Sequence, residues 1–260
     1  MPPASSSPVL AVEGVTKSFG PVHALESVDF SVRAGEVVAL VGDNGAGKST
    51  LVKVMSGIHG ADSGRIVFDG RPVTIAKPSD AVALGIATVH QDLALCDNLD
   101  VVANLFLGRE EIEPGVGHAT RSLDETDMEH RAHELLGGLA VTITDVRAEV
   151  GTMSGGQRQQ VAIARSLLGD PRVVILDEPS AALGVRQTAQ VLDLIERLRD
   201  QGHGVVLVSH NLAKVFAVAD RIYVLRLGRQ AGDFEAAKVT QDAVVAAITG
   251  AVTGLDGGGA

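Results

Sequence analysis

The sequence predicts an α/β fold built on a mainly parallel β-sheet. Only 3% of its 260 residues are aromatic, whereas Ala, Val, Leu and Gly are abundant. This composition is typical of Val-rich strands that are buried on both faces beneath Ala- and Leu-rich helices. Apolar runs recur along the chain at residues 37–41, 86–89, 173–176, 205–208 and 222–227. Long segments separate the first four runs, so crossover helices can join them as parallel strands.

Two further elements lie outside this parallel pattern. Residues 9–15 and 28–32 flank a turn at Gly20 and Pro21, which predicts an N-terminal antiparallel β subdomain. Residues 108–145 interrupt the rhythm of strands with acidic, helix-favouring sequence. We therefore place an inserted α-helical subdomain at about residues 92–165.

The ends of the chain differ in composition from the rest. Residues 1–8 are rich in Pro and Ser, and residues 251–260 are rich in Gly. Such low-complexity segments cannot bury enough apolar surface to order themselves, so we expect a disordered start and a flexible tail. One folded domain is expected between them, over residues 9–250.

Net charge and cysteine content restrict the class of protein. The chain has 22 Lys and Arg against 32 Asp and Glu, a net charge of -10, and its pI is about 5.2. This excess of acid disfavours non-specific binding to nucleic acid, and no nucleic-acid partner is expected. Cys96 is the single cysteine, the first residues do not resemble a secretory signal, and no apolar run approaches the length of a membrane span. These features predict a cytoplasmic protein whose membrane role, if any, is peripheral.

A glycine-rich loop follows the strand at residues 37–41. Its residues fit the pattern G-x-x-x-x-G-K-S/T, and a helix is expected to continue from them. Successive backbone N–H groups of such a loop face a phosphate, the Lys reaches the β- and γ-phosphates, and the Ser hydroxyl binds Mg²⁺. The predicted phosphate-binding residues are Gly42, Asp43, Asn44, Gly45, Ala46, Gly47, Lys48, Ser49 and Thr50.

Two carboxylates follow the strand at residues 173–176. Asp177 would hold Mg²⁺, and Glu178 would orient or deprotonate the attacking water. The next strand, at residues 205–208, delivers His210 to the same sheet edge as a γ-phosphate sensor, because ligands gather at the carboxyl ends of parallel strands. Solvated acids and an ordinary turn histidine are the alternatives.

Ser154, Gly155, Gly156 and Gln157 precede a predicted helix. A Ser followed three residues later by Gln is a capping box, and capping alone would explain both residues. A cap does not require two glycines, whereas a helix N-terminus that meets a phosphate at close range does. This segment is therefore a second candidate phosphate contact.

The order and spacing of these motifs resemble the ATP-binding subunit of ABC transporters. The resemblance runs from about residue 9 to residue 232 and includes GDNGAGKST, MSGGQRQQ, VVILDEPS and VSHN. It implies a P-loop NTPase fold, the cofactors ATP and Mg²⁺, and a homodimer formed on ATP binding. In that dimer the phosphate loop of one chain and Ser154–Gln157 of the other enclose each ATP. The resemblance also gives Gln91 a place at the metal and lets Phe19 stack on adenine, although Phe19 could instead be a packed hydrophobic residue.

Finer features are similar to the ATPases of ribose, xylose and fructose importers. QDLALCDNL, NLFLGRE and EPSAALGV carry this similarity, and the single set of motifs is typical of the fructose type. It implies integral-membrane permease subunits, an indirect sugar-binding partner, and a location on the cytoplasmic face of the membrane. Gly184 stands where most ABC ATPases have Asp. A subunit for another cargo, such as an amino acid, lipid or metal, and a soluble ABC ATPase without a transport role remain alternatives.

The segment at residues 92–110 contains more apolar residues than the surface of a small acidic subdomain should need. One interpretation is a docking groove for a helix of the permease. The alternative is that these residues pack inside the subdomain. The residues concerned are Leu93, Leu95, Leu99, Val101, Val102, Leu105 and Phe106.

Overall fold

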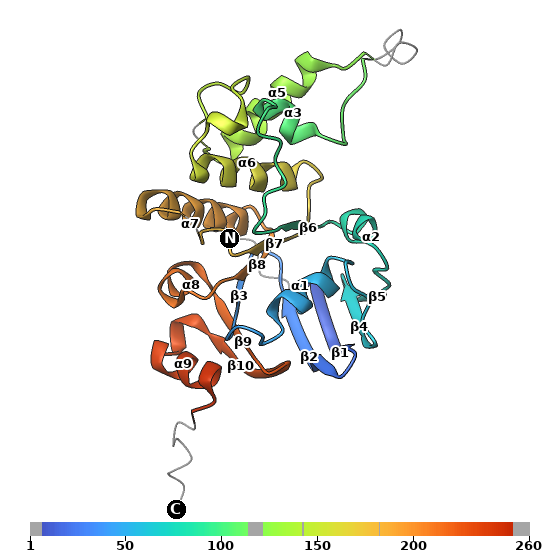
Figure 1. The fold of residues 1–260 in the computed structure, drawn as a ribbon, viewed down its shortest axis with the longest axis vertical. Helices are drawn as coiled ribbons and strands as arrows, with labels where there is room; N and C mark the ends of the chain where they lie inside the picture. The colour runs from blue at the N-terminus through green and yellow to red at the C-terminus, as the bar shows by residue number, and fades with distance from the viewer. Residues whose placement is uncertain (1–6, 114–121, 142, 182, 252–260) are drawn as a thin grey trace, which may run out of the picture. The chain divides into compact units, whose positions relative to one another are not determined.

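The computed structural model describes residues 7–113, 122–141, 143–181 and 183–251, and Figure 1 draws the other residues as a thin grey trace. The predicted disordered start and flexible tail lie outside the described residues, apart from positions 7, 8 and 251. The chain divides into two units. The first consists of Met1–Thr88, Pro171–Glu178 and Leu198–Ala260, and the second of Val89–Asp170 and Pro179–Arg197.

The first unit contains a mainly parallel sheet, as predicted. Among the described residues its strand order is β10-β9-β3-β8-β7-β6, and β3 pairs in parallel with both β8 and β9. β7 also pairs in parallel with β8, and β10 joins the edge antiparallel to β9. The strands are β3 (Val37–Val41), β6 (Ile86–Val89), β7 (Val173–Asp177), β8 (Gly204–Val208), β9 (Arg221–Arg226) and β10 (Arg229–Glu235).

The amino-acid composition of β3 and β8 suits strands that are buried at the centre of the sheet. All residues of β3 and β8 are buried, and both strands consist of Val, Leu, Ala and Gly. Branched side chains fit the pleated surface of a strand that is covered on both faces. The helices of the first unit are α1 (Lys48–Met55), α2 (Pro78–Ala83), α8 (Leu212–Val218), η2 (Ala236–Lys238) and α9 (Gln241–Thr249).

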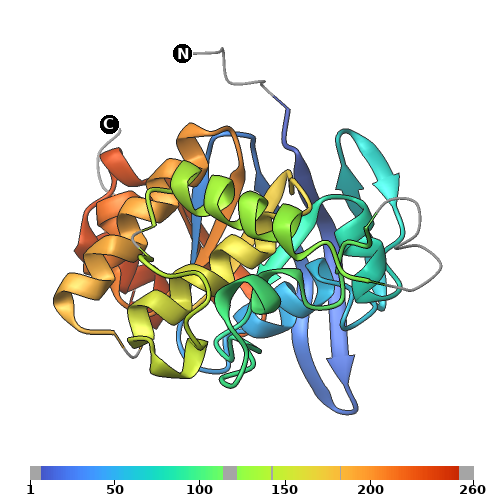
Figure 2. The ribbon, with the colours of Figure 1, turned by 90° about the horizontal axis from the view of Figure 1, so that it is seen from above.

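An antiparallel sheet of order β2-β1-β4-β5 completes the first unit, and the long pair β1 and β2 is drawn in blue in Figure 2. This confirms the predicted N-terminal antiparallel subdomain. Its strands are β1 (Leu10–Phe19), β2 (Val22–Val32), β4 (Ser63–Phe68) and β5 (Arg71–Val73). The pairing of β1 and β2 extends further than the apolar runs predicted, as far as the pair Phe19 and Val22. Mostly half-buried and exposed residues form this added length, so no continuous buried apolar run marks it in the sequence.

The two sheets and α1 share one hydrophobic core. Leu10, Leu25, Leu51 and Tyr223 are each no more than 1% exposed in this core. The ring of Tyr223 packs edge to face against Phe30, with 5.2 Å between the ring centroids. The Tyr223 hydroxyl donates to the Asp29 carbonyl, and burial raises the pKa of Tyr223. The N-terminal sheet is therefore anchored directly to β9.

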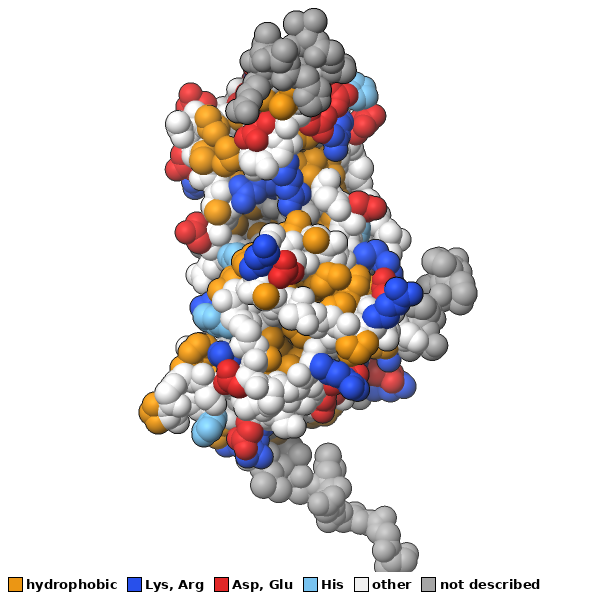
Figure 3. Space-filling model, turned by 90° about the vertical axis from the view of Figure 1, so that its right-hand side faces the viewer, with side chains coloured by type: hydrophobic (Ala, Val, Ile, Leu, Met, Phe, Trp, Pro, Cys, Tyr) orange, Lys and Arg blue, Asp and Glu red, His pale blue; other side chains and the backbone are white. Residues whose placement is uncertain are grey.

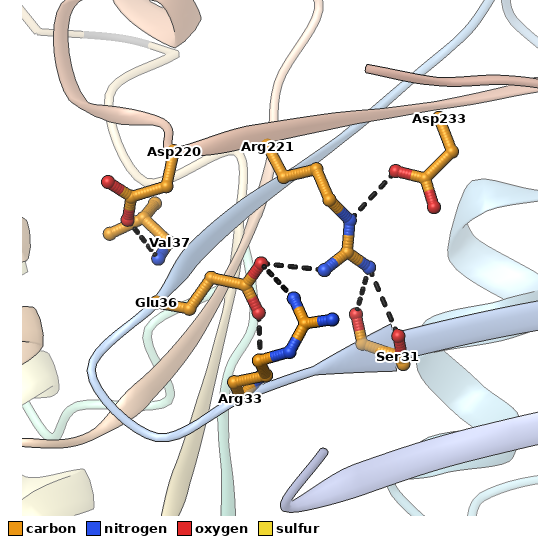
Figure 4. Close-up of polar contacts among 7 residues, drawn as sticks. All are labelled: Ser31, Arg33, Glu36, Val37, Asp220, Arg221 and Asp233. Atoms are coloured by element: carbon orange, nitrogen blue, oxygen red, sulfur yellow. Dashed lines mark hydrogen bonds and ion pairs between the residues drawn. The ribbon is translucent and has the colours of Figure 1, made fainter. Parts of the chain in front are cut away.

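A charged cluster links the same parts of the first unit (Figure 4). The Arg221 guanidinium lies 2.6 Å from Glu36 and 2.7 Å from Asp233, and it donates to the Ser31 carbonyl at 2.6 Å. Arg221 and Glu36 are each only 12% exposed. A planar guanidinium with several donors can satisfy all of these groups at once, which a Lys ammonium could not do with the same geometry.

The second unit is helical among its described residues. Its elements are α3 (Val101–Phe106), α5 (Glu125–Gly138), η1 (Val150–Thr152), α6 (Gly155–Leu167) and most of α7 (Val185–Asp200). α3 packs against both α5 and α6. Part of the predicted docking groove forms this core, because the exposed fraction of Val101, Val102, Leu105 and Phe106 is 2% or less. The hypothesis that Phe106 lines a surface groove is therefore wrong.

Asn104 organises the segment that joins Gln91 to α3. It is fully buried, its Oδ1 accepts from the Cys96 N–H at 2.7 Å, and its Nδ2 donates to the Cys96 carbonyl at 2.9 Å. Arg165 of α6 donates to the Ala94 carbonyl at 2.7 Å, and the Gly151 N–H donates to the Asp97 carbonyl at 2.8 Å. The segment after Gln91 is thus attached to η1, which precedes α6, and to the side of α6.

The surface carries charges of both signs. On the face drawn in Figure 3, Lys and Arg, Asp and Glu, and hydrophobic side chains are interspersed. Within the described ranges, no helix has the length and apolar character needed to cross a bilayer.

Candidate functional site

The phosphate-binding loop lies between β3 and α1. Gly42, Gly45 and Gly47 all have positive φ values, and the Ala46 N–H donates back to the Asp43 carbonyl at 3.1 Å. Glycine is required at Gly47, because its φ is 105° and an added Cβ would lie 2.5 Å from the Ala24 carbonyl oxygen. This backbone curl and the N-terminus of α1 are suited to an anion of the size of a polyphosphate.

Lys48 folds over the loop that precedes it. Its Nζ donates to the carbonyls of Gly42 at 2.8 Å and Asp43 at 2.9 Å. Burial lowers the pKa of Lys48, and the carboxylates of Glu178, Asp43 and Asp177 oppose that shift. The ammonium is therefore partly desolvated, which disfavours its charged form. The negative charge of a bound polyphosphate would offset this cost and favour the charged form.

The two carboxylates lie at the end of β7, as the sequence predicted, and both are half-buried. Glu178 Oε1 lies 2.7 Å from His210 Nδ1, within hydrogen-bonding distance. Its backbone N–H donates to the Val208 carbonyl at 3.0 Å. The structure therefore brings together Lys48, Asp177, Glu178 and His210 at the carboxyl ends of three parallel strands.

The backbone of Glu178 is strained. Its φ is 51°, a value in the left-handed region that is uncommon for residues other than Gly, Asn and Asp. The hydrogen bond to Val208 holds this conformation and directs the carboxylate to His210. Residues held in such sparsely populated conformations cluster at functional sites.

A cavity of about 400 Å³ adjoins the phosphate loop. Three of the residues that line it, Asp43, Asn44 and His210, were predicted as site residues. Leu212 and Ile248 also line it, with apolar side chains that the sequence analysis did not identify. No sequence motif marks these last two residues, because their place depends on how α8 and α9 pack. Ser49 is exposed beside Thr50, and a hydroxyl and a carboxylate such as those of Ser49 and Asp177 are oxygen ligands of the kind that Mg²⁺ prefers.

Phe19 lies at the end of β1 and is 44% exposed. Its ring meets His59 edge to face, with 5.2 Å between centroids, and Lys17 Nζ lies 5.6 Å from the Phe19 centroid. Lys17 is held by Asp62 at 2.7 Å. This partial exposure favours an aromatic surface for a ligand over a fully packed core residue.

The second unit contains the other predicted residues. The capping box is present at α6, since the Gln157 N–H donates to Ser154 Oγ at 3.3 Å and the Ser154 N–H donates to Gln157 Oε1 at 3.0 Å. Gly156 also has a packing role that the sequence analysis missed, because an added Cβ would lie 2.9 Å from the side chain of Gln187. Ser154 itself is exposed, as is Gln91 beyond β6.

Comparison with known proteins shows what this arrangement is similar to. The ABC transporter family model matches residues 25–181. The fructose import ATP-binding protein of Rhizobium meliloti is 45% identical over 95% of this chain and 96% of its own length. The ribose import ATP-binding protein of Chromobacterium violaceum is 44% identical over 93% of this chain, which spans 47% of that relative.

Solved structures show the same fold. The ADP conformation of an ATP-binding cassette of an ABC transporter has a TM-score of 0.79 and 26% identity, with 94% of this chain and 96% of that chain covered. The dimeric post-hydrolysis state of another ATP-binding cassette, bound to ADP and phosphate, has a TM-score of 0.72 and 24% identity. Its alignment covers 87% of this chain and 98% of that chain.

Proposed function

This chain belongs to the ABC transporter family, and from that premise we propose that it hydrolyses ATP to drive sugar import through a membrane permease. The proposal that the cargo is a sugar rests on one observation, the similarity to the fructose import protein over almost the full length of both chains. The chemistry follows from the site in the first unit, where a cation, two carboxylates and a histidine lie beside a phosphate-binding loop.

Each site residue has a proposed task. Bound MgATP would supply the phosphoanhydride bond and a metal that offsets the phosphate charge. The loop amides and Lys48 would hold the phosphates, and Ser49 and Asp177 would provide oxygen ligands for the metal. Gln91, in the second unit, keeps the role at the metal that the family resemblance implies. Glu178 orients a water molecule and takes its proton, and His210 holds the Glu178 carboxylate at 2.7 Å and contacts the terminal phosphate. Phe19 supplies an aromatic face for adenine.

We further propose that each ATP is shared between two copies of the chain. One chain provides the phosphate loop, and the partner provides Ser154 at the start of α6. Two observations support this arrangement: Ser154 is exposed at a capped helix N-terminus, and a structural relative has been solved as a dimer with ADP and phosphate. An exposed cap with an adjacent glycine can approach the phosphates of a ligand held by another chain.

Mixing two inactive variants tests this sharing. Lys48→Ala and Ser154→Ala chains should each hydrolyse little ATP alone, because each homodimer has two damaged sites. In a 1:1 mixture about half of the dimers are mixed, and each mixed dimer has one intact site, so about one quarter of the wild-type sites should be restored. Full hydrolysis by monomeric wild-type protein, measured far below the dimer dissociation constant, would refute the shared site.

The proposed partners are permease subunits in the membrane and, through them, a sugar-binding protein. This association would place the chain on the cytoplasmic face of the membrane. With Val101, Val102, Leu105 and Phe106 in the core, the half-buried side chains of Leu93, Leu95 and Leu99 remain the apolar contribution of this segment to docking.

The proposed function is tested by transport. Co-expression with the permease, co-purification, and uptake assays over a panel of sugars should show uptake that requires Lys48. Uptake of an amino acid, a lipid or a metal in place of every sugar would transfer the assignment to another cargo. ATP hydrolysis without permease binding would favour an ABC ATPase that has no transport role.

A further inference from the structure

The turn between β9 and β10 lies against the phosphate-binding loop. Arg226 and Arg229 face each other in register across two turn residues, Leu227 and Gly228. Both turn residues have positive φ values, 49° and 76°, as in the tight type I′ hairpin. Leu227 is 73% exposed, whereas Gly228 is buried. The buried side of this turn therefore faces the protein through a glycine.

Gly228 connects the loop to the N-terminal sheet through both of its backbone polar groups. Its N–H donates to the Ala46 carbonyl at 3.0 Å, and its carbonyl accepts from the Glu26 N–H at 2.7 Å. Ala46 belongs to the phosphate loop, and Glu26 belongs to β2. One residue of the turn thus fixes the distance between these two segments.

The three segments are packed so closely that side chains are excluded. A Cβ at Gly228 would lie 2.9 Å from the Ala24 carbonyl oxygen, and a Cβ at Gly47 would lie 2.5 Å from the same oxygen. That Gly47 Cβ would also lie 3.6 Å from the Gly228 Cα. Because the neighbours are backbone atoms, no rotation of a side chain can relieve the overlap.

The bond to Ala46 determines where the next amide points. A trans peptide is planar, so its carbonyl and its N–H point in opposite directions. With the Ala46 carbonyl held toward the turn, the Gly47 N–H points away from it, toward the side on which the loop meets a phosphate. We propose that Gly228 is a positioning residue for nucleotide phosphates, acting through the Ala46–Gly47 peptide. This inference rests on the proposed role of residues 42–50.

Gly70 provides a matched control. It lies between β4 and β5 with φ 73°, close to the 76° of Gly228, and an added Cβ there meets no heavy atom within 4 Å. Gly228→Ala and Gly70→Ala therefore impose similar backbone strain, but only the first pushes against the backbone beside the phosphate loop. We expect Gly228→Ala to raise the ATP Kd and the KM by about tenfold or more, as for the loss of a hydrogen bond to a charged group.

The expected result for Gly70→Ala is an ATP Kd within about twofold of wild type. Gly228→Ala should lose more in Tm than Gly70→Ala, because only its Cβ overlaps backbone atoms. The ATP Kd of both variants is therefore measured well below the lower Tm, where both are folded and stability does not affect the comparison. An equal ATP Kd for the two variants would overturn the proposal. Lys48→Ala distinguishes failure of the phosphate site from failure of the positioning role of Gly228. If Lys48→Ala binds ATP as wild type does, the proposed phosphate site itself is wrong.

Hydrogen exchange in the wild-type protein decides the matter if Gly228→Ala does not fold. When ADP orders the loop, the Gly228 amide should exchange at least about tenfold more slowly, since its acceptor lies in that loop. The Asp69 amide, which donates to the Val9 carbonyl at 2.9 Å in the same unit, serves as a control whose rate should stay the same. An ADP-independent rate at Gly228 would contradict the proposal.

Discussion

Replacement of Glu178 by Gln is expected to lower ATP turnover at least about a hundredfold, the usual effect of losing a general base. Gln has nearly the same shape and can still accept a hydrogen bond from His210, which lies 2.7 Å from the carboxylate. It cannot take a proton from water. Lys48 and Asp177 are unchanged, so binding of ATP should remain.

Two measurements check this prediction. Steady-state phosphate release should fall while the ATP Kd stays within a few-fold of wild type. Because ATP would then remain in the shared site, the variant should accumulate as a nucleotide-loaded dimer on a sizing column. Glu235→Gln is the control, since Glu235 is an exposed residue that pairs with Lys238 on the surface. Wild-type phosphate release by Glu178→Gln would remove Glu178 from the proposed role.

The components of the site could be predicted because each lies in a contiguous motif. The curl of residues 42–50 depends on local glycines, and Asp177 and His210 follow apolar strands whose carboxyl ends meet at one sheet edge. The strain at Glu178 could not be predicted, because its φ of 51° depends on a hydrogen bond to Val208 on the neighbouring strand.

Apolar content alone did not distinguish core from surface in the helical unit. Leu99 and Phe106 occur in the same apolar segment, yet Leu99 is half-buried and Phe106 is 2% exposed. The difference depends on how α3 packs against α5 and α6, which are distant in sequence. β4 and β5 were missed for a related reason: they are stabilised by pairing with β1 and with each other rather than by apolar runs of their own.

Gly184 stands where most ABC ATPases have Asp, and the structure shows whether a side chain would fit at this position. Its N–H donates to Gln187 Oε1 at 3.2 Å, and a Cβ added at Gly184 would lie 3.8 Å from that oxygen. This is an ordinary contact distance, so packing within the second unit does not exclude a side chain there. The absence of Asp at this position is not imposed by the local fold.

The charged cluster at Arg221 was not predicted, since its partners lie far away in the sequence, and it gives the largest expected effect on stability. Arg221→Met should lower the free energy of unfolding by about 3 kcal/mol, because the largely buried Glu36 carboxylate loses its closer cation and keeps only Arg33, whose guanidinium lies 3.3 Å away. For a chain of this size, Tm should fall by on the order of 10 °C. Thermal and urea unfolding measure both quantities.

Arg65→Ala is the matched control for Arg221→Met. Arg65 also pairs with a carboxylate between two strands, Glu13 at 2.5 Å, but the two side chains are 65% and 42% exposed. Water can solvate Glu13 when Arg65 is removed, so stability should change by less than about 1 kcal/mol. The 12% exposure of Glu36 gives water little access to its carboxylate.

A double-mutant cycle separates the buried charge from the loss of packing. Glu36→Gln in the Arg221→Met background removes the carboxylate that has lost Arg221, so the double variant should be more stable than the sum of the two single losses predicts. Asp233, the other carboxylate that loses Arg221, is 36% exposed and can be hydrated, so it needs no second substitution. Strictly additive losses, or a loss at Arg221 no larger than that at Arg65, would show that the cluster is solvated and does not hold β9 and β10 to the N-terminal sheet.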